Sequence, residues 1–255
     1  MTSISHRPAS LDAATRLAPL VVDLGGAFML DPSVLGPGKE AGYPGGFSYY
    51  VVGRGGVLGD VDANVVSSAF GFFEPSLVRS LWEAGVVVEG ARAGADRYTQ
   101  GCCDWGRRRL ASWTGAARTA ELLARVVDQA DDSGLALFAG WRAQARPDDP
   151  IGRAYLLIHI LRELRGGAHL VATLAGGITP LEAVLANPTG HGTAQAERFG
   201  WKAPFPAVEQ LASAMTAAEA TTNGLAARCL DVLTEHELDE LVDLVGEAHR
   251  IALGS

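Results

Sequence analysis

The chain has 255 residues, of which 48% are hydrophobic, so it is long and apolar enough to form one large globular domain or two small ones. Its formal net charge is −8. Because phosphate binding requires clustered lysine and arginine, this deficit of basic residues argues against a general nucleic-acid-binding or anionic membrane-binding surface.

The cysteines and the first residues indicate the cellular compartment. There are 3 cysteines, Cys102, Cys103 and Cys229, and no C-x-x-C motif. This count argues against a disulfide framework and a zinc ribbon. Residues 1–19 lack the apolar segment of a signal peptide. We therefore expect a protein of the reducing cytoplasm.

The first fifth of the chain predicts one helix, a loop and an extended segment. The stretch LDAATRLAPLVVDL predicts a helix capped by Ser10 and ended by Gly25–Gly26, although Pro19 inside it allows two shorter helices. Residues 27–46 are dense in glycine and proline and predict a loop, which at this length is often functional. Tyr49–Val52 is short, aromatic and β-branched, which favours a strand or an extended approach.

The next stretch, GRGGVLGD, predicts a glycine-rich turn before a helix over about residues 63–73, with Asp60 or Asp62 as the N-cap. Free backbone N–H groups, a positive helix end and the neighbouring Arg54 would together form a cradle for an anion. The alternative is a tight turn with capping aspartates and a solvated Arg54. The motif is neither a Walker A loop nor a dinucleotide-binding fingerprint.

The longest apolar run, residues 151–186, is the stretch around which we expect the fold to be organised. Asp149 and Pro150 predict a helix start, and Gly176–Gly177 predict its end before Thr179 caps a further helix. Apolar residues surround the predicted helix on most sides, so it should be buried. Arginines and a glutamate interrupt the run, which argues against a membrane span. The polar members of the helix are His159, Arg162, Glu163, Arg165 and His169.

Three of these polar residues, Arg162, Arg165 and His169, have i, i+3, i+7 spacing and so share one stripe. Unpaired buried charge is costly, so the stripe must either pair with acids elsewhere in the fold or line a pocket for an anionic ligand. Guanidinium groups suit carboxylate, sulfate and phosphate. Gly166–Gly167 favour the pocket, because glycines inside a helix cost roughly 1 kcal/mol each and usually permit a close approach.

We therefore predict a mainly α fold with a multi-helix core around this buried helix over residues 1–190 and a small, winged-helix-like helical tail over residues 191–255. Thr234 and Glu237 predict a capping box in the tail. Residues 205–255 hold two basic and nine acidic side chains, a balance of −7 that repels DNA phosphates.

The core of the buried helix, Leu-Arg-Glu-Leu-Arg-Gly-Gly-Ala-His over residues 161–169, resembles an actinobacterial family of helix-turn-helix proteins that share a Leu-Arg-Glu-x-Arg-Gly-x-x-His pattern. The resemblance extends over about residues 11–250. Two positions depart from the family pattern, since Leu164 replaces a frequent histidine and Gly167 a frequent acid. The other matching positions are Tyr49, Tyr50, Arg54, Gly56, Leu58, Gly59, Phe72, Phe73, Pro75, Leu77, Val78 and Trp82.

Proteins similar to this family occur in natural-product pathways, and a candidate relative is the subunit pair that closes an aziridine ring by eliminating sulfate in azinomycin and vazabitide biosynthesis. That resemblance implies intramolecular displacement of sulfate by an amine, which must first lose its proton. The residues available for acid–base catalysis are Asp62, Glu163 and His169. The residues available to bind the substrate are Tyr50, Arg54, Arg162 and Arg165.

Three functional hypotheses follow. The first is a biosynthetic enzyme that acts on a small substrate with an anionic group and uses neither a metal ion nor another cofactor, since His159 and His169 are too far apart on one helix to share a metal. The second is a non-catalytic ligand-binding or scaffold subunit, with a second small protein chain as partner. The third is a helix-turn-helix transcriptional regulator. We expect no membrane partner, and the acidic tail argues against a nucleic-acid partner.

Overall fold

The computed structural model describes residues 6–188 and 190–254, and within them it contains thirteen α-helices, two 3₁₀ helices and no strand. The predicted mainly α class is therefore confirmed. The longer helices are α1 (Pro8–Gly26), α5 (Pro75–Glu89), α6 (Ala91–Arg109), α7 (Ala116–Gln129), α9 (Pro150–Ala175), α12 (Ala212–Leu230) and α13 (Glu235–Leu253). The shorter elements are α2 (Pro32–Glu40), α3 (Gly46–Gly55), η1 (Gly56–Leu58), α4 (Ala63–Phe70), α8 (Ala136–Arg142), α10 (Pro180–Leu185), α11 (Gly192–Arg198) and η2 (Glu209–Leu211).

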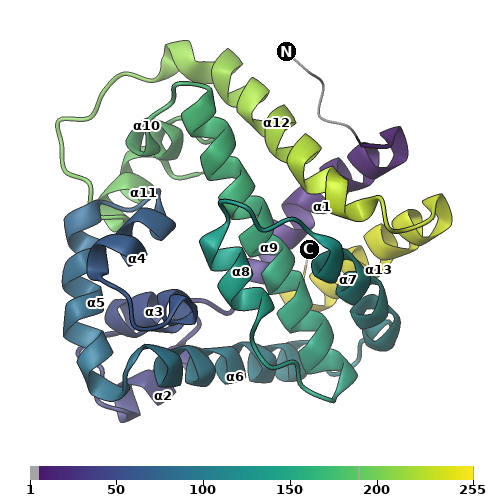
Figure 1. Ribbon diagram of the computed structural model, residues 1–255, viewed down its shortest axis with the longest axis horizontal. Coiled ribbons are helices and arrows are strands. Elements are labelled where there is room, and N and C mark those ends of the chain that lie inside the picture. Colours follow the sequence, from purple (N-terminus) through teal and green to yellow (C-terminus); the bar gives the residue numbers. More distant parts are fainter. Residues whose placement is uncertain (1–5, 189, 255) are drawn as a thin grey trace.

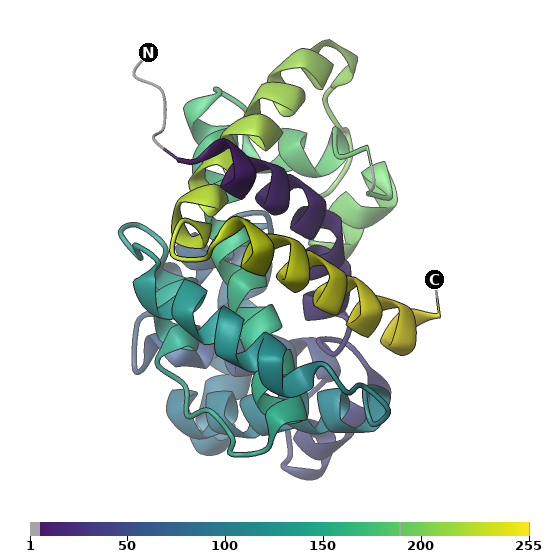
Figure 2. The same ribbon diagram turned by 90° about the vertical axis from the view of Figure 1, so that its right-hand side faces the viewer.

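Helix α9 runs through the middle of the molecule, as the sequence predicts (Figure 1). It begins where Asp149 accepts a hydrogen bond from the backbone N–H of Gly152 at 2.7 Å, and it ends at Ala175, just before the predicted glycine pair. In Figure 1, α3, α4 and α5 lie on one side of α9, and α1, α7 and α13 lie on the other. The view from the right-hand side shows α1, α13 and α7 side by side (Figure 2).

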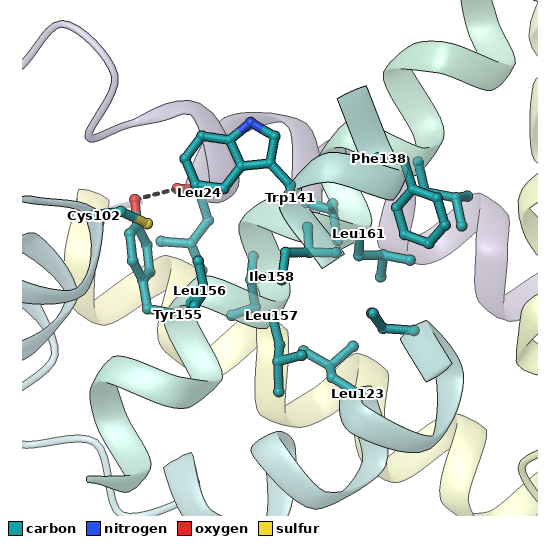
Figure 3. Packing of buried hydrophobic residues seen from close by; sticks show 14 of the residues in the cluster. Leu24, Cys102, Leu123, Phe138, Trp141, Tyr155, Leu156, Leu157, Ile158 and Leu161 are labelled. Atoms are coloured by element: carbon teal, nitrogen blue, oxygen red, sulfur yellow. Dashed lines mark hydrogen bonds between the residues drawn. The ribbon is translucent and has the colours of Figure 1, made fainter. Parts of the chain in front are cut away.

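The core surrounds the first half of α9. Leu156, Leu157 and Ile158 are fully buried against side chains from α7 and α8 (Figure 3). The hydroxyl of Tyr155 donates a hydrogen bond to the carbonyl oxygen of Leu24 at 2.9 Å, which attaches α9 to α1. This apolar packing explains why a helix that carries several charged residues can occupy the centre of the fold.

Two predicted features of the N-terminal region are wrong. The N-cap of α1 is Arg7 rather than Ser10, because Pro8 starts the helix earlier and Ser10 lies buried inside it; Pro19 is accommodated in one continuous helix. The predicted loop over residues 27–46 contains helix α2, which begins at Pro32. Its N-cap is Asp31, whose side chain accepts a hydrogen bond from Ser33 N–H.

The predicted extended segment Tyr49–Val52 is also wrong, because it is the middle of helix α3. Val51 and Val52 are fully buried, so a short apolar run that periodicity cannot assign is here a buried helical segment. The ring of Tyr49 packs over Gly38 of α2, in space that a side chain on Gly38 would occupy.

The C-terminal helices α12 and α13 pack against α1, and their Leu230 and Leu241 belong to the same hydrophobic core as α9. The capping box at the start of α13 is confirmed: Thr234 Oγ1 accepts from Glu237 N–H at 3.3 Å, and the Glu237 carboxylate accepts from Thr234 N–H at 2.9 Å. The boundary near residue 190 stays a prediction. Among the described residues, no helix combines the length and hydropathy needed to cross a bilayer.

Candidate ligand-binding site

A cavity of about 890 Å³ is lined by residues of α3 and α4 and, facing them, of α8 and α9. In Figure 1, α3 and α4 lie across from α8 and α9. Residues of α11 and the segment at residues 26–30 complete the walls of the cavity. This volume is in the range of known small-molecule sites. Five phenylalanines contribute to the mostly apolar lining, Phe47, Phe72, Phe73, Phe138 and Phe199.

One end of the cavity is polar and is built around a buried ion pair. Arg54 of α3 donates two hydrogen bonds to the carboxylate of Glu163 on α9, Nε to Oε1 at 3.0 Å and Nη2 to Oε2 at 2.9 Å. Arg162 Nη1 donates to the same Oε1 at 3.1 Å, and Arg54 Nη1 donates to the hydroxyl of Tyr50 at 3.3 Å. The side chain of Glu163 is 1% exposed and that of Arg54 is 12% exposed. The two guanidinium groups therefore share one carboxylate.

The packing around Arg54 fixes its guanidinium group. The group lies over the ring of Phe70 at 4.7 Å from the ring centroid, a cation–π contact. The backbone carbonyl of Arg54 accepts a hydrogen bond from Trp141 Nε1 at 3.2 Å, which joins α3 to α8. A charged group held on three sides is preorganised to meet a ligand.

The neighbouring charges control protonation. Burial by itself would raise the pKa of Glu163, but the positive charge of Arg54, with His159 and Arg162, lowers it to about 2. Burial would lower the pKa of Arg54, and Glu163 instead raises it. Burial lowers the pKa of His159 to about 4, against the opposing effect of Glu163. At neutral pH, Glu163 is therefore ionised and His159 is neutral.

The lining carries an excess of positive charge although the whole chain is acidic. Its charged members are three arginines, Arg54, Arg162 and Arg198, and one acid, Glu163. The Nε of Arg162 is buried and has no hydrogen-bond partner among the described residues. The Nε of Arg165, outside the cavity lining, is in the same position, so the excess charge alone points to a ligand, whose anionic group would supply the missing negative charge.

The other predicted site residues lie elsewhere. Arg165 forms an ion pair with Glu219 of α12, and His169 Nδ1 lies 3.0 Å from the hydroxyl of Thr222. Asp62 is the N-cap of α4 and accepts a hydrogen bond from the backbone N–H of Asn64 at 2.8 Å. The structure therefore brings together Tyr50, Arg54, Arg162 and Glu163 of the predicted residues, and places Asp62, Arg165 and His169 outside the cavity lining.

The predicted stripe on α9 is divided between two neighbours. Arg162 lies beside the glycine pair at the end of α1, where a Cβ built at Gly25 would be 3.0 Å from the Cβ of Arg162. Arg165, about 60° around the helix, meets α12 instead. Arg165 therefore pairs with an acid of another helix, as the first alternative predicts, and Arg162 lines the cavity. Binding of an anionic ligand by the stripe stays a prediction.

The glycines of the GRGG segment have a different role from the one predicted, whereas Gly166 and Gly167 both lie in the cavity lining. The GRGG segment is no anion cradle, because Gly53 belongs to helix α3 and its missing side chain leaves room for the Tyr98 ring, with Tyr98 Cβ only 2.6 Å from a Cβ built there. Its Arg54 is buried rather than solvated. On α9, a Cβ at Gly167 would lie 2.9 Å from Leu135, whereas a Cβ at Gly166 would meet no atom within 4 Å. Gly166 faces open space in the cavity lining.

Several lining residues had no signal in the sequence. Leu137 and Phe138 belong to α8, and Leu135 is its N-cap. Phe199 follows α11 and stacks on Phe73 with ring centroids 4.0 Å apart. Apolar side chains of this kind are as common in cores as in cavities. Among the described residues, no group of three or more histidine, cysteine, aspartate and glutamate side chains has an arrangement that could hold a metal ion.

The model of a protein family described as a helix-turn-helix family matches residues 14–214. No curated protein and no solved structure matches the chain. The matched segment includes every residue that lines the cavity and ends near the start of α12. The family match therefore covers nearly all of the predicted core and ends within the predicted C-terminal tail, before most of the acidic residues of the tail.

Proposed function

We propose that this chain, which belongs to the helix-turn-helix family, binds in its central cavity a small, mostly apolar molecule that carries an anionic group. The observation that carries the proposal is the polar end of the cavity, where Arg54 and Arg162 share the single carboxylate of Glu163. Two guanidinium groups and one carboxylate leave one positive charge uncompensated at this end of an apolar space. A bound carboxylate or sulfate would neutralise it.

Binding accounts for the polar end better than catalysis does. Of the three acid–base candidates, only Glu163 lines the cavity. With its pKa lowered to about 2 against the effect of burial, this carboxylate is a weak proton acceptor at neutral pH. His159 is fully buried and is not among the lining residues. We therefore assign Glu163 the role of holding Arg54 and Arg162 in place.

Aziridine formation by displacement of sulfate is a more specific candidate for the same cavity. The two arginines suit a sulfate leaving group, because guanidinium binds it through paired hydrogen bonds. Incubation with a vicinal amino-sulfate, followed by detection of free sulfate and of the cyclised product by mass spectrometry, tests this candidate. Turnover that Arg162→Ala abolishes would replace the binding assignment with a catalytic one.

Family membership favours a second candidate function, a regulator whose DNA binding responds to the ligand. Residues 14–214 hold 18 basic and 20 acidic side chains, so most of the net charge of −8 lies outside the matched segment. The matched segment is therefore nearly neutral and should repel DNA phosphates less than the acidic tail does. An electrophoretic mobility assay with duplex DNA at low and moderate salt, with and without ligand, tests this candidate. Absence of a shift at low salt would remove it.

Isothermal titration calorimetry tests the proposed binding directly. Phenylbutyrate and its neutral amide differ only in the charged group, so we expect the acid to bind the wild-type protein at least tenfold more tightly. Arg162→Ala should weaken binding of the acid about tenfold to a hundredfold, because charge-assisted hydrogen bonds contribute about 1.5–3 kcal/mol. It should leave the amide nearly unaffected. Equal binding of acid and amide would exclude an anion-binding role.

A further inference from the structure

The mouth of the cavity is rimmed by exposed apolar side chains. The described residues include seven large hydrophobic side chains that are exposed, and four of them line the cavity. These four come from three elements of the wall and are Leu30, Val65, Val171 and Leu174, with exposed fractions of 39%, 47%, 46% and 52%. Exposed apolar side chains that cluster at one opening, rather than singly, are typical of a binding site.

The cavity is also elongated along α9. The lining residues of this helix follow one face, from Glu163 at the polar end through Gly166 and Leu170 to Leu174 at the rim. Leu174 follows Glu163 by eleven positions, which corresponds to roughly 16 Å along the helix axis. Glu163 and the rim residue Leu174 therefore lie at opposite ends of the wall that α9 forms.

Gly166 leaves the middle of this wall free of side chains. A Cβ at this position would meet no other atom within 4 Å, so packing does not explain the glycine. A glycine inside a helix is destabilising relative to alanine, and its retention here without a packing contact is consistent with space kept for a bound molecule.

We infer that the ligand is an elongated amphiphile, with an acidic group at Arg54 and Arg162 and a flexible apolar chain that follows α9 past Gly166 to the rim at Leu174. This inference rests on the proposed function, because it specifies the molecule that occupies the same cavity. The acidic group neutralises the excess positive charge. The apolar chain contacts the phenylalanine-rich lining and covers the rim, which removes exposed apolar surface from water.

A chain-length series separates this inference from the proposed function. Octanoate, dodecanoate and hexadecanoate are titrated by calorimetry below their micelle-forming concentrations, beside phenylacetate and dodecanamide. We expect the affinity to rise at least tenfold from octanoate to dodecanoate. We also expect dodecanoate to bind at least tenfold more tightly than either phenylacetate or dodecanamide. If phenylacetate binds as tightly as dodecanoate, the elongated ligand is wrong and anion binding stands. If no acid binds, or if dodecanamide binds as tightly as dodecanoate, the proposed function fails as well.

Two variants locate the chain within the cavity. Gly166→Leu fills the open space at the wall and should lower the affinity for dodecanoate at least tenfold. The affinity for phenylacetate, which binds at the polar end, should change less than threefold. Leu174→Gln should lower the affinity for hexadecanoate more than that for octanoate. Val87→Gln is the matched control, since Val87 is a helical side chain that is 79% exposed and lies outside the cavity lining.

Circular dichroism and thermal unfolding confirm that each variant is folded. Unchanged chain-length dependence in both Gly166→Leu and Leu174→Gln would overturn the path along α9. An equal loss of affinity in Val87→Gln would show that the acids bind to exposed apolar surface in general, which would also overturn it.

Discussion

Helix α9 carries two arginine–glutamate pairs that are alike in chemistry and different in surroundings. Arg54 and Glu163, with side chains 12% and 1% exposed, meet at the end of a cavity, whereas Arg165 and Glu219, 13% and 45% exposed, join α9 to α12. Solvent reaches the carboxylate of the second pair but not that of the first. Ion pairs of the same composition therefore adjoin a cavity in one place and join two helices in another.

The difference in burial predicts the largest effect. Glu163→Gln removes the negative charge that stabilises a buried Arg54, and we expect it to lower the free energy of unfolding by about 3–5 kcal/mol. Glu219→Gln is the matched control, and it should cost no more than about 1 kcal/mol because Glu219 is partly solvated. Urea denaturation of both variants measures the contrast. Equal losses would mean that the two pairs are energetically equivalent.

The second prediction concerns the stability of the protein at acidic pH. Burial lowers the pKa of His159 from 6.5 to about 4, so the unfolded chain binds this proton more readily than the folded protein. The stability contribution of neutral His159 is therefore complete above pH 6.5 and is lost as the pH falls toward 4, by about 3 kcal/mol. Glu163, with its pKa lowered from 4.5 to about 2, adds a further loss of stability as the pH falls from 4.5 toward 2.

His159→Gln should flatten the dependence of unfolding free energy on pH between 6.5 and 4, as measured by urea titrations at several pH values. His169→Gln is the matched control on the α12 side. Burial also lowers the pKa of His169, but its side chain is 21% exposed whereas that of His159 is fully buried, so this variant should remove a smaller part of the dependence. A larger flattening in His169→Gln would reverse the comparison.

Substitutions of two adjacent glycines on α9 give the smallest effects, and we expect Gly166→Ala to be the more stabilising of the two. Gly166→Ala should raise the free energy of unfolding by up to about 1 kcal/mol, because alanine favours the helix and its methyl group enters open space. Gly167→Ala should raise the free energy of unfolding by less, or lower it, because its Cβ would lie 2.9 Å from Leu135. Thermal unfolding measures both. A destabilising Gly166→Ala would show that this part of the wall is not open.

The sequence contained enough local information to predict most of α9 and its surroundings. Asp149–Pro150 and Gly176–Gly177 mark the helix ends closely, and the cap at Thr179 and the capping box at Thr234 occur as expected. These features depend on residues within four positions of one another. The same local rules failed for Tyr49–Val52, because burial on all sides removes the periodicity that separates a strand from a helix.

The site could be predicted only in part, because its central contact is not local. Arg54 and Glu163 are 109 positions apart, and each was a candidate without an indication that the two would pair. Helical spacing placed Arg162, Arg165 and His169 on one stripe, but it does not reveal which edge of that stripe meets α12 and which meets a cavity. Asp62 was suggested both as a cap and as a catalytic group, and the structure places it at the cap.

The most direct test of the account compares the two sides of α9 in one binding experiment. Dodecanoate is titrated by calorimetry into the wild type, Arg162→Ala and Arg165→Ala, each shown to be folded. The account predicts at least a tenfold loss of affinity for Arg162→Ala and less than a threefold change for Arg165→Ala. A loss for Arg165→Ala that equals or exceeds that for Arg162→Ala would contradict the assignment of the binding site to the cavity beside Arg54 and Glu163.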